Sequence, residues 1–221
     1  MGAVVTRRGF VQGLGLAAGA LVLSVRSGSA AAPAVPSSAA TLTANAFVAV
    51  APDGVVTIVC HRSEMGQGIR STLPALIARE LGADMARVRV VQADGDPRYG
   101  DQDTDGSTSI RAFYEELRLV GATARTLLTT AAAKAWGVAP DACDARDHCV
   151  THRPSRRTKS FGELVPLALA LPLPKPTAVR LRPAAEVAAP GEPMPVLDAP
   201  AMVTGTALYG ADIVLPGMLV A

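Results

Sequence analysis

The sequence predicts an α/β fold of the mixed α+β kind, with a small mixed sheet and two helices, one of them long. Two β-like runs, Phe47–Val50 and Val55–Cys60, flank the turn signal Asp53-Gly54. A third apolar run, Val88–Val91, lies between two stretches with helical spacing of apolar residues. The order strand, strand, helix, strand, helix is typical of a mixed α/β layer.

The two helices are predicted from apolar periodicity. The first covers Ile69–Leu81, and Gly82 suits its C-terminal end. The second covers about Ser107–Trp136, is about 45 Å long at 1.5 Å per residue, and ends at Gly137. A hairpin is expected within Cys143–Thr151.

The N-terminus has the layout of a twin-arginine export signal. Arg7-Arg8 precedes the apolar run Gly13–Leu23, and Ala30-Ala31-Ala32 offers the small residues that a signal peptidase requires. The alternative is a basic N-terminus followed by a core helix, which glycines in the apolar run disfavour. We therefore expect a periplasmic protein, or one anchored to the inner membrane where the signal stays uncleaved.

Composition divides the chain into five parts. Residues 1–32 are the predicted signal, and 33–44, rich in Ala, Ser and Pro, are a tether. Residues 45–152 are the organised domain, and 153–200 are a proline-rich connector. Residues 201–221 are the expected truncated start of a next domain.

Charge and composition exclude some functions. The chain has 21 Lys and Arg against 19 Asp and Glu, a net charge of +2, and only 4% aromatic residues. A nucleic-acid partner is therefore not expected. The 49% hydrophobic content is enough for a core, and three cysteines cannot make a disulfide framework.

Two glycine-containing loops are candidate anion sites. They are Glu64-Met65-Gly66-Gln67-Gly68 and Asp105-Gly106-Ser107-Thr108-Ser109, and each precedes a predicted helix. A helix start offers unpaired N–H groups and positive dipole charge, and glycine permits close approach, so the loops could cradle phosphate. The Ser and Thr hydroxyls and the Gln67 amide add polar groups. Simple helix capping without a ligand is the alternative.

A calcium loop is a second, weaker hypothesis. Asp101–Gly106 has carboxylates at positions 1, 3 and 5 and glycine at position 6, but Ala112 stands where the bidentate glutamate belongs. A solvated acidic loop is the alternative.

Cysteines and histidines form a third group. Cys143, His148, Cys149 and His152 fit no standard zinc spacing, so zinc binding, a cross-strand Cys143–Cys149 disulfide and two thiols without a role all stay open. His61 is expected to be a hydrogen-bonded structural histidine, and Cys60 a small buried apolar residue.

The loop Glu64–Gly68, set between a strand and a helix, resembles the molybdenum hydroxylases, the family of xanthine dehydrogenase and aldehyde oxidase. The resemblance is to the molybdopterin-binding large subunit of the isoquinoline 1-oxidoreductase and exported aldehyde dehydrogenase type. Similar segments run in order along the chain: Asn45-Ala46-Phe47, Pro97-Arg98-Tyr99-Gly100, Gly106-Ser107-Thr108-Ser109-Ile110, Phe161-Gly162-Glu163-Leu164, Leu197-Asp198-Ala199-Pro200 and Val203–Tyr209.

The resemblance implies a function for the two loops. Residues 45–152 would be part of a molybdopterin-binding domain, with a molybdenum–molybdopterin cofactor in the cytosine dinucleotide form. Gly66, Gln67 and Gly68 would touch the cofactor, and Gly106, Ser107, Thr108 and Ser109 would hold its pterin or phosphates. The enzyme would hydroxylate aldehydes or N-heterocycles with oxygen from water. Its expected partners are a small iron–sulfur subunit, a cytochrome c electron acceptor and the remainder of the large subunit.

Two departures from the family matter. Asp105 stands where the family has glycine, and a carboxylate beside a phosphate is repulsive. The family's catalytic glutamate lies near the far end of a longer chain, so no catalytic residue and no metal ligand is predicted here. The chain is expected to be inactive without the remainder. The alternatives are a non-catalytic fragment and an exported calcium-binding protein.

Overall fold

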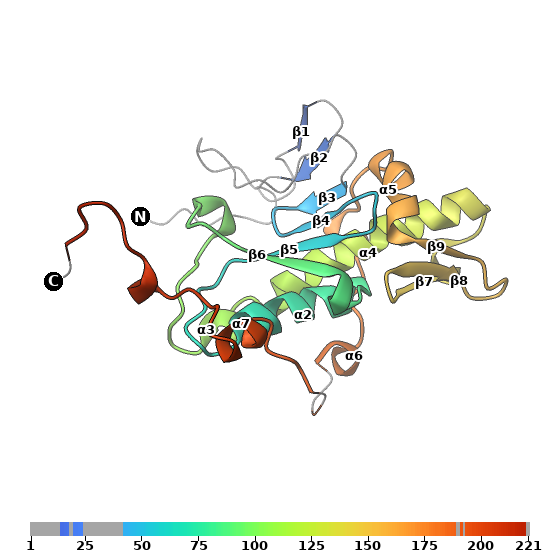
Figure 1. Ribbon diagram of the computed structural model, residues 1–221. Helices are drawn as coiled ribbons and strands as arrows, with labels where there is room; N and C mark the ends of the chain where they lie inside the picture. Colours follow the sequence, from blue (N-terminus) through green and yellow to red (C-terminus); the bar gives the residue numbers. More distant parts are fainter. Residues whose placement is uncertain (1–13, 18–19, 24–41, 189–190, 192, 220–221) are drawn as a thin grey trace.

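The computed structural model describes residues 14–17, 20–23, 42–188, 191 and 193–219. Its architecture is mixed α/β, as predicted: one six-stranded sheet, one three-stranded sheet and helices packed against them (Figure 1). The strands of the larger sheet lie in chain order: β1 (Leu14–Ala17), β2 (Ala20–Leu23), β3 (Leu42–Asn45), β4 (Val48–Val50), β5 (Val56–Cys60) and β6 (Val88–Gln92). The pairs β2–β3 and β5–β6 are parallel, and the other pairs are antiparallel.

The arginine pair of the expected export signal lies outside the described residues. Its apolar run is partly described, as the antiparallel pair β1 and β2. The export signal stays a prediction. No helix in the described ranges is long and apolar enough to cross a membrane.

The centre of the sheet forms as the sequence predicts. β4 and β5 make a hairpin, and Gly54 takes the left-handed φ of 88° that the turn requires. Helix α2 (Ile69–Leu81) follows β5, ends at Gly82 in the left-handed conformation, and returns the chain to β6. This crossover places the loop Glu64–Gly68 at the carboxyl end of β5.

The long helix is broken near its start. Helix α3 (Thr108–Arg111) ends at Ala112, and α4 (Tyr114–Trp136) begins after Phe113, whose φ of −112° and ψ of 3° lie outside the helix. The prediction of one helix from Ser107 is therefore wrong, whereas the end at Gly137 is confirmed. The Phe113 ring instead packs on the His61 ring, with centroids 4.8 Å apart.

The core lies between the larger sheet and helices α2 and α4. Leu73 and Ile77 of α2, Leu127 of α4 and Ile58 of β5 belong to one buried apolar cluster. Figure 1 shows α4 running past the sheet toward the smaller one. The smaller sheet consists of β7 (Cys143–Arg146), β8 (Cys149–His152) and β9 (Thr158–Ser160).

The hairpin β7–β8 confirms the expected hairpin but not a cross-strand disulfide. Its register places Cys143 opposite His152 and Arg146 opposite Cys149. All three cysteines are free thiols.

The segment predicted as a connector contains ordered elements. Helix α5 (Phe161–Leu169) begins with a capping box between Ser160 and Glu163 and contains Pro166. Its buried residues include Phe161, Leu164, Val165 and Ala168. Helix α6 (Ala184–Ala188) and helix α7 (Ala199–Val203) follow, and short 3-10 helices lie at Met85–Arg87, Pro97–Tyr99, Pro140–Ala142, Pro176–Ala178 and Gly210–Asp212. The domain boundaries themselves stay a prediction.

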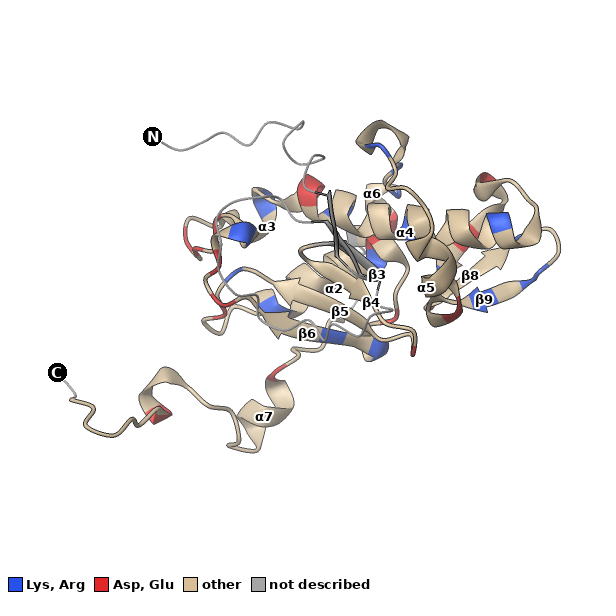
Figure 2. Ribbon diagram, turned by 90° about the horizontal axis from the view of Figure 1, so that it is seen from above, with Lys and Arg blue, Asp and Glu red and all other residues tan. Residues whose placement is uncertain are grey.

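After α7 the chain extends away from the body (Figures 1 and 2). Val203 is 83% exposed and Val214 is 84% exposed. The described part of this stretch, up to residue 219, contains no strand.

A buried carboxylate ties the chain between α5 and α6 to the core. Glu80 of α2 is fully buried and forms ion pairs with Arg118 at 3.0 Å and with Arg125 at 2.8 Å, both on α4. Its Oε1 also accepts the backbone N–H of Arg182 at 2.7 Å. One side chain therefore joins α2, α4 and the proline-rich stretch.

Candidate functional site

The first glycine loop is held by its own glutamate. Glu64 Oε1 accepts the N–H groups of Gly66 at 2.7 Å and Gly68 at 3.0 Å, and Oε2 accepts the N–H of Arg70 at 3.0 Å. Burial alone would raise the pKa of Glu64, but these backbone N–H groups lower it below its ordinary value. Glu64 therefore engages three of the N–H groups around this helix start, those of Gly66, Gly68 and Arg70.

Backbone conformation explains why this loop contains glycines. Gly66 and Gly68 have φ angles of 97° and 83°, and a Cβ at either position would meet nothing within 4 Å. Backbone conformation, rather than crowding, requires glycine here, and the space around the loop is open.

Gln67 shares a carbonyl acceptor with Thr104, the residue before the second loop. Its Oε1 accepts the Met65 N–H at 2.6 Å, and its Nε2 donates to the Ser63 carbonyl at 2.9 Å. The same carbonyl accepts the Thr104 hydroxyl at 2.7 Å. The Gln67 side chain is exposed, and its amide keeps a second N–H and further lone pairs for a ligand.

The second loop offers exposed backbone donors. Gly106 and Ser107 have φ angles of 50° and 57°, and the turn is closed by the Thr108 N–H on the Asp105 carbonyl at 3.0 Å. Within the described residues, the N–H groups of Gly106 and Ser107 have no hydrogen-bond partner. Both residues are exposed, so these N–H groups can reach a ligand.

Sequence reasoning missed Arg62, which lies two residues before the first loop and binds the second. Its side chain is fully buried. Nη1 contacts the Asp101 carbonyl at 2.9 Å and its carboxylate at 3.0 Å, Nη2 donates to Thr108 Oγ1 at 3.0 Å, and Nε donates to Ser109 Oγ at 3.3 Å. The guanidinium also lies over the Phe113 ring, 5.1 Å from its centroid. An arginine directly after a buried strand and before a glycine loop is the signal that could have indicated it.

The acidic loop shows no metal site. Asp101 is paired with Arg62, and its Oδ1 also accepts the Asp103 N–H at 2.9 Å. The N–H of Asp103 and the Arg62 guanidinium lower the pKa of Asp101. Among the described residues, no group of three or more His, Cys, Asp and Glu side chains is arranged to hold a metal ion. Neither the calcium nor the zinc hypothesis therefore gains support.

His61 is buried, but it is not the hydrogen-bonded histidine that we expected. Its ring is 1% exposed and packs edge-on against Phe47 at 5.2 Å and Phe113 at 4.8 Å between centroids. Neither ring nitrogen has a hydrogen-bond partner within the described part of the chain. Burial and the neighbouring Arg62 charge lower the pKa of His61 to about 4. The expected burial of Cys60 is confirmed, and it raises the pKa of this thiol to about 11.

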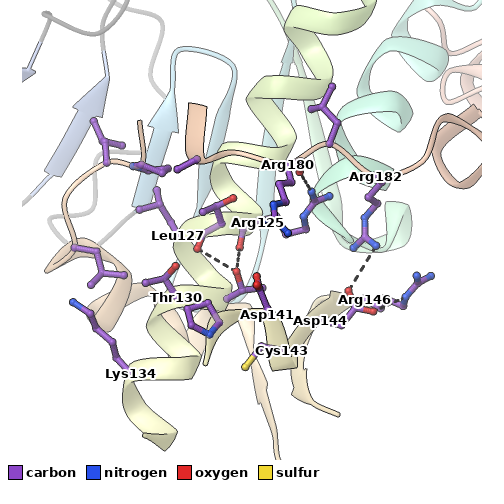
Figure 3. Close-up of a pocket in the computed structure, with 18 of the residues that line it drawn as sticks. Arg125, Leu127, Thr130, Lys134, Asp141, Cys143, Asp144, Arg146, Arg180 and Arg182 are labelled. Carbon is purple, nitrogen blue, oxygen red and sulfur yellow. Dashed lines mark hydrogen bonds and ion pairs between the residues drawn. The ribbon is translucent and has the colours of Figure 1, made fainter. Parts of the chain in front are cut away.

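A cavity of about 920 Å³ lies elsewhere, between α4, β7 and the stretch 171–183 (Figure 3). Its charged lining residues are Arg125, Lys134, Asp141, Asp144, Arg146, Arg153, Arg180, Arg182 and Glu186. Ion pairs join Arg146 and Arg182 to Asp144 and Glu186 across it. No residue of either glycine loop lines this cavity, so it is separate from the candidate site.

The fold and the two loops define an α/β domain that offers directed hydrogen-bond donors to a polar ligand. Residues 7–187 match the sequence profile of the molybdopterin cofactor-binding domain, and the chain therefore belongs to this family of the molybdenum hydroxylases.

Three relatives are similar in sequence to this chain. The chain is 35% identical to the beta subunit of isoquinoline 1-oxidoreductase from Brevundimonas diminuta, with 98% of this chain and 33% of that protein covered. It is 34% identical to a membrane-bound aldehyde dehydrogenase (pyrroloquinoline-quinone) of Gluconacetobacter polyoxogenes, over 78% of this chain and 23% of the relative. It is 31% identical to a nicotinate dehydrogenase subunit of Pseudomonas putida, over 78% and 14%. The chain thus spans at most a third of these relatives.

Proposed function

We propose that the two glycine loops contact a molybdenum–molybdopterin cofactor, and that the chain works as part of a hydroxylase subunit on aldehydes or N-heterocycles. The observation that carries the proposal is that the segments bearing the family's two loop motifs are bonded to each other: Arg62 donates to Thr108 and Ser109, and the Ser63 carbonyl accepts from Gln67 and Thr104. When bound, the cofactor supplies the redox centre at which oxygen from water is transferred.

The chemistry of the loops fits a pterin with phosphates. Gly106 and Ser107 offer unpaired N–H groups, and the hydroxyls of Ser107, Thr108 and Ser109 lie in the same turn. Gly66 and Gly68 leave open space beside the exposed Gln67 amide, which can both donate and accept. The second loop would therefore hold phosphate or pterin oxygens, and Gln67 would meet a polar ring edge.

The relatives support the substrate classes and the need for partners. Two of their names refer to N-heterocycles and one to an aldehyde, and two are named as subunits. We propose an iron–sulfur partner subunit, a cytochrome c acceptor, and dependence on the remaining part of the large subunit. The cytosine dinucleotide form of the cofactor, export by the twin-arginine route and a periplasmic location belong to the same proposal.

The test is cofactor retention by loop variants. Gln67→Ala is purified with the wild-type chain from cells that make the cofactor, and molybdenum is measured by mass spectrometry. We expect about three-fold to ten-fold less molybdenum per chain, as for loss of one or two hydrogen bonds. Lys134→Gln, on the separate cavity wall, is the matched control and should retain the wild-type amount. Equal retention by Gln67→Ala, or loss in both variants alike, would contradict the proposal.

A further inference from the structure

We propose that Arg62 is a positioning residue that makes Ser109 the hydroxyl donor of the second loop toward the cofactor and engages Thr108 internally. The inference rests on the proposed function and assigns different roles to two adjacent hydroxyls. The observation behind it is the direction of the hydrogen bonds that the buried Arg62 guanidinium makes.

A guanidinium has only donors, so it fixes the direction of every bond that it makes. Arg62 Nε donates to Ser109 Oγ at 3.3 Å, and Nη2 donates to Thr108 Oγ1 at 3.0 Å. Both hydroxyl oxygens therefore act as acceptors toward Arg62. The proton of each hydroxyl must then point to another acceptor.

Thr108 has that acceptor inside the chain. Its Oγ1 donates to the Asp105 carbonyl at 2.9 Å, and the Asp105 carboxylate lies 3.5 Å from the same oxygen. Its hydroxyl is thus engaged on both sides and closes the turn. It has no proton left for a ligand.

Ser109 has no such acceptor. Among the described residues, its hydroxyl has only the bond from Arg62, and the side chain is half-buried. The donated bond polarises the O–H group and makes it a better donor. Ser109 therefore offers a directed O–H group in the same turn as the free N–H groups of Gly106 and Ser107. Such a set recognises carbonyl or phosphate oxygens.

Arg62 also adds little net charge to the site. Its side chain is 0% exposed, and Nη1 lies 3.0 Å from the Asp101 carboxylate. The guanidinium is fixed further by the Phe113 ring, which the break between α3 and α4 makes available. The loop would thus bind by oriented donors rather than by an unpaired cation.

The first test uses the chain without cofactor. Arg62→Lys keeps the charge beside Asp101 but cannot reproduce the planar fork to both hydroxyls. We expect amide hydrogen exchange in 101–111 to become about ten-fold faster, with exchange in α2 unchanged. Arg89→Lys, which alters an arginine bonded to Thr57 on the sheet, is the control. Unchanged exchange in 101–111 in folded Arg62→Lys would overturn the positioning role.

The second test separates the two hydroxyls by molybdenum retention. We expect Ser109→Ala to lose about five-fold of the bound molybdenum and Thr108→Val less than two-fold, because only Ser109 loses a bond to the ligand. Arg62→Lys should lose at least as much as Ser109→Ala, because Arg62 also orders the turn that carries the Gly106 and Ser107 N–H groups. A larger loss in Thr108→Val than in Ser109→Ala would overturn the assignment.

The two tests fail independently. If the wild-type chain retains no molybdenum, the proposed function fails, and hydrogen exchange still decides whether Arg62 orders the loop. If molybdenum is retained but the two hydroxyl variants behave alike, the inference fails and the proposed function stands.

Discussion

At the residue scale, long-range contacts decide which loop groups can meet a ligand. Glu64 occupies the N–H groups of Gly66, Gly68 and Arg70, whereas those of Gly106 and Ser107 have no partner within the described chain. Local sequence could not reveal this difference, because both loops precede a helix and both contain glycine. Arg62 was missed for the same reason, since its partners lie at least 39 residues away.

Substitutions of Asp105 test how a negative charge beside the second loop affects cofactor retention. The turn is closed by its backbone carbonyl, so Asp105→Gly and Asp105→Asn should keep the Thr108 bonds. Removing the carboxylate removes repulsion toward phosphate, and we expect molybdenum retention equal to or up to about three-fold above wild type. Weaker retention in Asp105→Asn, which changes charge with little change in shape, would count against a phosphate at this loop.

The burial of His61 leads us to expect that the folded chain becomes less stable at acidic pH. Its pKa in the folded chain, about 4, is below the ordinary 6.5, because burial and Arg62 disfavour the imidazolium. The unfolded chain binds the proton first, so this contribution is fully present above pH 6.5 and is lost as the pH falls toward 4. The loss is at most about 3 to 4 kcal/mol.

His61→Phe should reduce the loss of unfolding free energy between pH 6.5 and pH 4, because the substituted ring cannot take up a proton. Denaturant unfolding at several pH values measures it. Burial also lowers the pKa of His148, so some loss should remain in the variant. An unchanged pH dependence in His61→Phe would contradict the buried neutral imidazole.

At the element scale, local signals predicted the central strands and helix α2. They did not predict the break in the long helix or the presence of helix α5. The hairpin β4–β5, helix α2 and strand β6 follow from Asp53-Gly54, apolar periodicity and Gly82. The break at Phe113 was invisible because Ile110 and Phe113 continue the apolar stripe of α4. Proline density concealed α5, whose capping box and buried apolar face outweigh Pro166.

Glu80 should control how the stretch around Arg182 packs on α2 and α4. Glu80→Gln leaves the buried Arg118 and the half-buried Arg125 without their carboxylate, so we expect a free energy of unfolding about 3 kcal/mol lower. Hydrogen exchange in 180–187 should rise first. Glu115→Gln, an exposed change at the start of α4, is the control and should cost less than about 1 kcal/mol.

At the scale of the whole molecule, the described chain is a domain that leaves apolar side chains exposed after α7. Val203, Leu208, Val214 and Leu219 are each at least 80% exposed. The relatives, of which this chain covers at most 33%, have further chain that could cover such residues. We therefore expect the function of the whole molecule to depend on partner chains. Neither a local motif nor the fold of one domain identifies those partners.

Export can be tested apart from the cofactor. Changing Arg7 and Arg8 to lysine removes the arginine pair that defines the proposed signal. We expect the wild-type chain in the periplasmic fraction and the variant in the cytoplasm, measured by fractionation and immunoblotting. The same distribution for both chains would contradict the twin-arginine route.

Elemental analysis decides whether this chain holds a molybdenum–pterin cofactor at its two loops. Molybdenum and phosphorus are measured in the purified wild-type chain, alone and with any copurifying remainder of the large subunit, from cells that make the cofactor. We expect about one molybdenum per chain, with two phosphorus atoms if the dinucleotide form is bound. Folded, soluble protein without molybdenum in either preparation would contradict it.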